Sequence, residues 1–83
     1  MFAKKLFGQR LLQIRKENHE TQDALAEVID TVKSHISEME NGKVTTTIEK
    51  LALICEHYKV SADYLLGLSD DPELRGVDNR KEE

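Results

Sequence analysis

The side chains best suited to hydrogen bonding with a partner lie together in the short segment 33–41. Five of its polar residues offer an amine, two hydroxyls, an imidazole and a carboxylate: Lys33, Ser34, His35, Ser37 and Glu38. Ile36 and Met39 are three residues apart, so they fall on one side of a helix and leave the other sides polar. The segment therefore predicts a helix with a narrow buried stripe and a polar surface that is free to contact another molecule.

No comparable set of residues supports catalysis or metal binding. Cys55 and His57 are two positions apart on one predicted helix, so they do not face each other. Cys55 falls on the apolar side of that helix, where a small buried hydrophobe is expected. The three histidines and the single cysteine do not have metal-ligand spacing, and the chain has no glycine-rich phosphate loop. The sequence therefore predicts no enzyme, no metal and no cofactor.

Two short helices joined by a tight turn would position the polar surface. Thr21 is a good N-cap for a helix over residues 22–29. The apolar side of that helix carries Leu25, Ala26 and Ile29. Residues 30–32 break the pattern, residues 33–41 form the second helix, and Gly42 ends it because glycine accepts a left-handed backbone. This spacing is that of a helix-turn-helix motif.

Several short motifs follow one another between residues 7 and 68. They are Thr21-Gln22, Leu25-Ala26, Ile36-Ser37, Glu40-Asn41-Gly42-Lys43, Val60-Ser61 and Asp63-Tyr64-Leu65-Leu66-Gly67. In this order and at these separations they resemble the phage-repressor and Cro-like bacterial regulators, the Xre family. The resemblance implies an all-α, five-helix domain like that of lambda repressor, with the helix-turn-helix over about residues 21–42.

The resemblance implies that the second helix of the motif contacts DNA bases. The base-contact positions of the family fall on Lys33, Ser34, His35 and Glu38, with Ser37 nearby. Lysine can donate to O6 and N7 of guanine, and glutamate can accept from N4 of cytosine. The alternative for Lys33 and Glu38 is a solvated surface pair, and Glu38 could instead orient a neighbouring basic side chain.

The resemblance also implies phosphate contacts and one internal ion pair. Gln22 matches a phosphate contact at the start of the first motif helix, where a helix N-terminus favours anions. Asn41 and Lys43 match contacts at the end of the second helix. Arg15 and Glu40 match a pair in which a bidentate arginine orients the recognition helix. The alternative for this pair is two unrelated surface charges.

Two places depart from the family pattern. The turn, usually Gly-apolar-Ser, reads Asp30, Thr31 and Val32, and aspartate tolerates positive φ better than most residues. Because Thr31 can cap a helix with its side chain and Val32 cannot, the recognition helix could begin one residue early, which would rotate its register by about 100°. Glu20 stands where the family usually has an apolar residue, so the packing of that corner is expected to differ.

Helical periodicity also predicts the elements on either side of the motif. A first helix over residues 6–18 would bury Phe7, Leu11 and Ile14. A later helix would start from a capping box of Thr46 and Glu49 and run to about Tyr58. Its expected buried stripe is Ile48, Leu51, Ile54, Cys55 and Tyr58.

The end of the chain is expected to hold one more helix and a tail. Ser61 would cap a short helix over residues 62–66, which Gly67 would close. Residues 1–69 are then the expected domain. Residues 70–83 are charged and have few apolar groups, so they are expected to form a disordered tail.

The composition of the chain indicates in which compartment it works and what kind of partner it binds. The 83 residues fit one domain, and the net charge of −4 is unfavourable for a DNA-binding protein. Residues 69–83 hold three basic and six acidic residues, so the rest of the chain is nearly neutral. A single cysteine excludes an internal disulfide and favours a reducing cytoplasm. No apolar run approaches the roughly 20 residues of a membrane span, and no signal peptide is evident.

Residue patterns and resemblance together predict a sequence-specific, DNA-binding transcriptional regulator. The expected form is a repressor that binds double-stranded DNA as a homodimer on a two-fold operator. Its expected dimer surface comprises Tyr64, Leu65 and Leu68, with Leu12. The alternative is a protein–protein module on the same fold, such as an antitoxin or anti-regulator subunit with weak DNA binding, which the acidic balance and the atypical turn favour. A regulatory protein partner is compatible with both.

Overall fold

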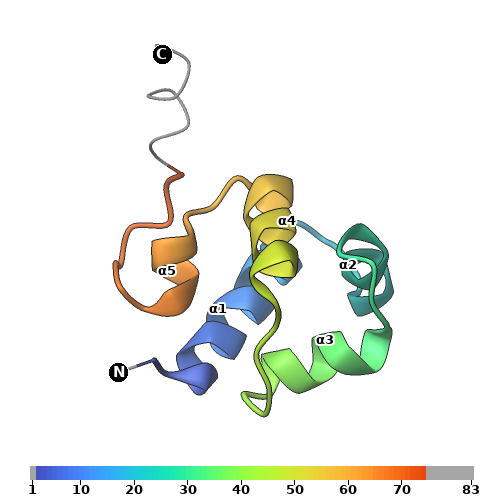
Figure 1. The fold of residues 1–83 in the computed structure, drawn as a ribbon. Coiled ribbons are helices and arrows are strands. Elements are labelled where there is room, and N and C mark those ends of the chain that lie inside the picture. The colour runs from blue at the N-terminus through green and yellow to red at the C-terminus, as the bar shows by residue number, and fades with distance from the viewer. Residues whose placement is uncertain (1, 75–83) are drawn as a thin grey trace.

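The computed structural model describes residues 2–74 and contains five helices (Figure 1). They are α1 (Lys4–Glu17), α2 (Gln22–Val28), α3 (Lys33–Glu40), α4 (Ile48–Tyr58) and α5 (Ala62–Leu66). Within the described residues, strand-like pairing is limited to one antiparallel bridge between Val60 and Glu73. The expected all-α, five-helix class is confirmed. None of the helices described is long and apolar enough to cross a membrane.

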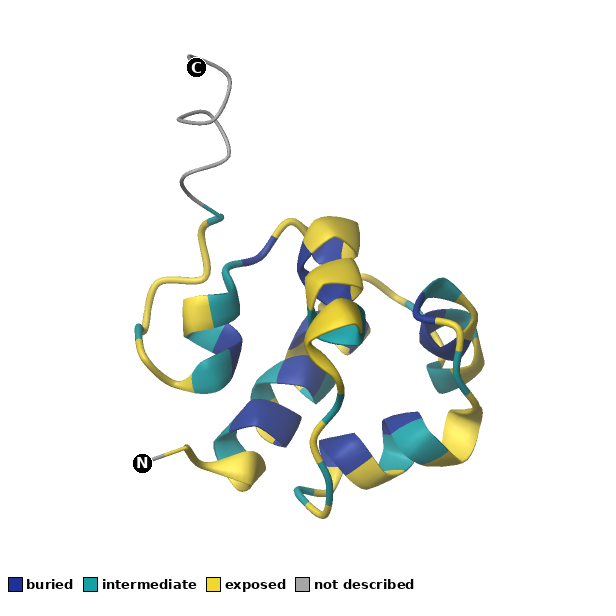
Figure 2. Cartoon of the chain, viewed as in Figure 1, coloured by how far each residue is buried: buried dark blue, intermediate teal, exposed yellow. Residues whose placement is uncertain are grey.

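One hydrophobic core joins the five helices. α1 packs against α3 and α5, while α2 packs against α3 and α4. Each of the five helices, or the residue that caps it, contributes at least one fully buried large side chain: Leu11, Leu25, Ile29, Ile36, Met39, Ile54 and Leu65. Figure 2 shows buried stretches on the helices, with exposed stretches on their other sides. The apolar stripes expected on the first three helices are therefore confirmed.

The start of α4 differs from the expectation. Thr47, rather than Thr46, is the N-cap, and its hydroxyl accepts a hydrogen bond of 3.1 Å from the main-chain N–H of Lys50. The Thr46–Glu49 capping box is therefore wrong. Ile48 opens the helix and is 84% exposed, so its assignment to the buried stripe is also wrong. The helical period holds, but this first turn lies beyond the buried residues that α4 contributes to the core.

Gly8 sets how closely α1 approaches α3. A Cβ at this buried position would collide with the main-chain oxygen of Met39 and lie 2.8 Å from that of Glu40. The absent side chain therefore lets α1 lie directly on the last turn of α3. The sequence holds a weak signal for this contact, because a glycine inside a helical pattern usually has a packing reason.

Residues 70–74 fold back onto the domain, which differs from the expectation of disorder from residue 70. The main-chain N–H of Ser61 donates to the carbonyl oxygen of Pro72 at 2.9 Å, next to the bridge between Val60 and Glu73. Main-chain hydrogen bonds hold this segment, and a scarcity of apolar side chains gives no sign of them. Residues 75–83 lie outside the described residues, so the expectation for them is untested.

Arg10 ties the chain after α5 to α1. Its guanidinium donates to the carbonyl oxygens of Tyr64 and Ser69 and pairs with the carboxylate of Asp70 at 2.9 Å. The guanidinium carbon also lies 4.1 Å from the centre of the Tyr64 ring. These contacts give Arg10 and Tyr64 a structural role.

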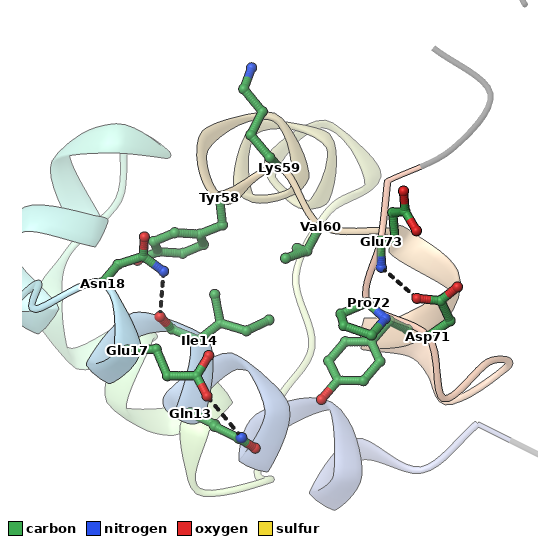
Figure 3. A pocket seen from close by; sticks show the side chains of 11 residues that line it. Gln13, Ile14, Glu17, Asn18, Tyr58, Lys59, Val60, Asp71, Pro72 and Glu73 are labelled. Carbon is green, nitrogen blue, oxygen red and sulfur yellow. Dashed lines mark hydrogen bonds between the residues drawn. The ribbon is translucent and has the colours of Figure 1, made fainter. Parts of the chain in front are cut away.

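The folded-back segment forms one wall of an open cavity of about 410 Å³ (Figure 3). Its apolar part is lined by Ile14, Tyr58, Val60 and Pro72. Polar side chains of α1, among them Gln13, line another side of the cavity. No residue of α2 or α3 lines it, so this cavity is separate from the helix-turn-helix surface.

Candidate nucleic-acid interface

The outer side of α3 brings together the five residues expected to contact bases. Ile36 and Met39 are fully buried beneath them and fix the face that α3 turns to the core. Lys33, Ser34 and Glu38 are exposed, while His35 and Ser37 are half-buried. The polar groups therefore share one solvent-facing surface on a helix whose other side belongs to the core.

The start of α3 has the register that the base-contact assignment assumes. Asp30 adopts the left-handed conformation expected of it, with φ of 58°. Val32 is the N-cap and makes no side-chain capping hydrogen bond, so α3 begins at Lys33. The early start from Thr31 does not occur, because it would need helical backbone at Val32, and Val32 is extended with φ of −112° and ψ of 158°. The main-chain N–H of Thr31 instead donates to the carbonyl oxygen of Ala26 at 2.8 Å.

Lys50 compensates for the lack of glycine in this turn. Its ammonium group reaches from α4 to the carbonyl oxygens of Ile29 and Asp30, at 3.1 and 3.2 Å. A cation at a helix C-terminus is favourable because it faces the negative end of the helix dipole. The sequence did not predict this role of Lys50, because Lys50 lies twenty positions after Asp30 and no local pattern links the two residues.

A buried polar network connects α3 to α1 and α2. Nε and Nη2 of Arg15 donate to the two carboxylate oxygens of Glu40, at 2.6 and 3.1 Å. The two side chains are only 10% and 4% exposed. The hydrogen bond with Glu40 raises the pKa of Arg15, despite the opposing effect of burial. The structure thus contains the bidentate pair expected between these residues, and both charges are buried.

Gln22 joins the same network from the start of α2. Its amide nitrogen donates to Glu40 Oε1 at 2.9 Å. A phosphate contact by Gln22 would therefore use its main-chain N–H in the first turn of α2. At the other end of the motif, the Asn41 amide donates to the carbonyl oxygen of Ser37 at 2.8 Å, and Lys43 is exposed. The three residues expected to contact phosphates thus lie at the two ends of the motif.

Glu20 forms a polar corner where an apolar one is usual in the family. Its carboxylate accepts a hydrogen bond from the Tyr58 hydroxyl at 2.7 Å and lies 2.7 Å from Nε2 of His57. Its carbonyl oxygen accepts from Nη1 of Arg15 at 2.6 Å. Burial raises the pKa of Glu20, but the hydrogen bonds from Tyr58 and His57 outweigh it, so the pKa lies below its ordinary value. Burial, with the bond to Glu20, raises the pKa of Tyr58.

The remaining candidate for reactivity is a core residue. Cys55 is 7% exposed, and burial raises the pKa of its thiol, so the unreactive protonated form is favoured. Among the described residues, no group of three or more potential ligands could hold a metal ion.

These features define the helix-turn-helix class, and comparison with known proteins supplies the family. A family model described as a helix-turn-helix domain matches residues 8–70. The chain belongs to this helix-turn-helix family. It is 40% identical over 68 residues to the uncharacterized HTH-type transcriptional regulator YobD of Bacillus subtilis strain 168. The match covers 82% of this chain and 61% of YobD, so the chain spans about three fifths of that relative's length.

Solved structures place the fold among phage-repressor and Cro-like regulators. The P22 c2 repressor, solved in complex with a synthetic operator, aligns with a TM-score of 0.70 and 30% identity, covering 74% of this chain and 92% of that one. The N-terminal DNA-binding domain of SinR from Bacillus subtilis aligns with a TM-score of 0.67 and 32% identity, covering 75% and 91%. The resemblance to phage-repressor and Cro-like regulators is confirmed, and this family is one of regulators rather than enzymes.

Proposed function

We propose that this protein binds double-stranded DNA sequence-specifically, with α3 in the major groove, and so regulates transcription. The observation that carries the proposal is the exposed polar side of α3. Two sets of buried contacts hold it in one orientation: the core residues Ile36 and Met39, and the Arg15–Glu40 pair. A helix presented in this way can bring its N-terminal side chains to base edges. The known relatives support it, because two structural neighbours are a repressor with its operator and a DNA-binding domain.

Within the proposal, two groups of residues have separate tasks. Base edges are contacted by Lys33, Ser34, His35, Ser37 and Glu38. Phosphates are contacted by Gln22, Asn41 and Lys43, which position the protein without reading sequence. His35 is partly restrained for this task, because its Nε2 lies 3.3 Å from the hydroxyl of Thr46 in the following loop.

The proposed form is a repressor that acts as a homodimer on a two-fold operator in the cytoplasm. One domain of this size contacts few base pairs, and two-fold dimers on paired half-sites are the usual remedy. The dimer surface expected from the sequence needs correction at Leu65, which is fully buried and unavailable to a partner. Leu68 is 75% exposed and stays in the proposed surface.

A protein–protein module remains the alternative function. The observations that favour it are the net charge of −4 and the exposed carboxylate of Glu38 on the recognition helix, which would face phosphates in a DNA complex. This module would bind its protein partner tightly and DNA weakly, without sequence preference.

Fluorescence anisotropy across a salt series separates the two functions. The purified protein is titrated into a labelled duplex from the DNA flanking its own gene and into a scrambled duplex. Specific binding predicts a preference for the native duplex and an affinity that falls steeply with salt. Equal and feeble binding to both duplexes would favour the protein–protein module.

Two substitutions on the recognition helix then test the assigned base contacts. Lys33→Ala and Ser34→Ala should each weaken binding to the native duplex by about 1–3 kcal/mol where a base contact is lost. Lys16→Ala is the matched control, because Lys16 is an exposed lysine near the end of α1. Wild-type specificity in both α3 variants would refute the assigned base contacts.

A further inference from the structure

The first turn of α1 rests on the loop that ends the recognition helix. Gly42 follows α3 with φ of 76°, and a Cβ at Gly42 would lie 3.0 Å from Cγ and 3.1 Å from Cα of Lys5. The stem of Lys5 therefore lies against the main chain of Gly42, although the two residues are far apart in sequence. Figure 1 shows the same arrangement, with the start of α1 beside the end of α3.

This corner collects positive charge in a chain that is acidic overall. Lys4 and Lys5 open α1, Lys43 follows Gly42, and all three lysines are exposed. The first turn of α1 contains no acidic residue. Three other cations are already engaged by groups of the chain itself: Arg10, Arg15 and Lys50. The corner is therefore well suited to attract a phosphate.

We propose that Lys5 contacts a DNA backbone phosphate together with Lys43, a role that presupposes the DNA binding proposed above. The two lysines flank Gly42, whose missing side chain lets the stem of Lys5 lie against the main chain next to Lys43. The contact lies at the C-terminal end of α3, so it fixes how deeply that end enters the groove. Such a contact adds affinity and orientation and carries no base information.

The two ends of α3 then differ in task. Its first residues, Lys33 and Ser34, face base edges. The Lys5–Lys43 corner holds the backbone at the other end of the helix. This arrangement also lets a protein of net charge −4 bind DNA, because the interaction depends on local charge within about a Debye length, roughly 8–10 Å, rather than on the total.

The test is the salt dependence of DNA affinity in Lys5→Gln. Each phosphate contact contributes about 0.9 to the slope of log affinity against log salt concentration. Lys5→Gln should therefore reduce the slope by about 0.9 and weaken binding to native and scrambled duplexes by the same factor. Lys5→Arg keeps the charge and should retain the wild-type slope. Lys16→Gln, at the opposite end of α1, is the matched control and should leave the slope unchanged.

The outcomes separate this site from the function on which it depends. A wild-type slope and affinity in Lys5→Gln, when the wild type itself prefers the native duplex, would overturn the Lys5 site and leave the proposed function intact. A selective loss of affinity for the native duplex would also overturn it, because Lys5 would then be reading bases. Absence of any salt-dependent binding by the wild type would overturn both. Melting curves of the variants confirm that each is folded at the temperature of the assay.

Discussion

Removing the arginine of the buried Arg15–Glu40 pair should cost a large part of the stability of this domain. Arg15→Met keeps an unbranched apolar stem but leaves the Glu40 carboxylate, which is 4% exposed, without its guanidinium. Breaking a buried pair by removing one partner costs about 3–5 kcal/mol. Because the amide of Gln22 still donates to Glu40, we expect the lower end of that range, about 3 kcal/mol.

That loss is large relative to the total free energy of unfolding of the domain. At roughly 0.05–0.15 kcal/mol per residue, a chain of this length has a free energy of unfolding of about 4–12 kcal/mol. Each 1 kcal/mol shifts the melting temperature of a small domain by about 4–8 °C, so Arg15→Met should melt about 12–24 °C below the wild type. Circular dichroism during heating and urea unfolding measure both quantities.

The double variant Arg15→Met/Glu40→Met separates stability from orientation. Replacing both members of a buried pair with apolar residues is often neutral or stabilising, so its melting temperature should return near the wild-type value. Its affinity for the native duplex should stay low, because no bidentate pair then orients α3. Lys16→Met, an exposed cation on the same helix, should change stability by less than about 0.5 kcal/mol.

Two results would refute this reasoning. Melting of Arg15→Met within a few degrees of the wild type would mean that Glu40 does not need its buried partner. Wild-type DNA affinity in the double variant would mean that the pair stabilises the fold without orienting the recognition helix.

Three further predictions concern other contacts. The pKa of Glu20 lies below its ordinary value of 4.5, so its carboxylate contributes stability above that pH, which is lost as pH falls through the folded pKa. Glu20→Gln should therefore flatten the acid side of a urea-unfolding profile against pH, and an unchanged profile would contradict this. Gly8→Ala should lower stability by about 1–3 kcal/mol through overpacking, although alanine is the better helix former, and melting at or above the wild-type temperature would refute the close contact of α1 with α3. Lys50→Met should cost about 1–2 kcal/mol and speed amide exchange at Thr31; wild-type exchange rates would show that Lys50 does not hold this turn.

Local periodicity was enough to predict the helices of the motif. Leu25 and Ile29 on α2, with Ile36 and Met39 on α3, follow a helical repeat that only one side of each helix can bury. Thr21 caps α2 as expected, its hydroxyl accepting from the main-chain N–H of Ala24 at 3.1 Å. These features depend on residues three or four apart, so a sequence displays them directly.

Contacts between distant residues account for what the sequence did not reveal. Gly8 against α3, Lys50 on the end of α2 and the Tyr58–Glu20 hydrogen bond each join residues that no local pattern links. Ile48 shows the opposite kind of error. It follows the helical repeat, but the hydrophobic core does not reach as far as the first turn of α4, so its side chain is exposed. The Arg15–Glu40 pair was predicted only through the family resemblance.

The reach of Lys50 to the end of α2 limits how far this motif can be transplanted. A graft of residues 21–43 onto another helical scaffold would carry the left-handed Asp30 but leave the carbonyl oxygens of Ile29 and Asp30 without their ammonium partner. A portable unit must therefore extend at least to residue 50, and it must start before Arg15 because buried Glu40 needs its guanidinium partner. Exchanging the outer side chains of α3 alone leaves this support in place, so binding preference can be re-engineered without rebuilding the turn.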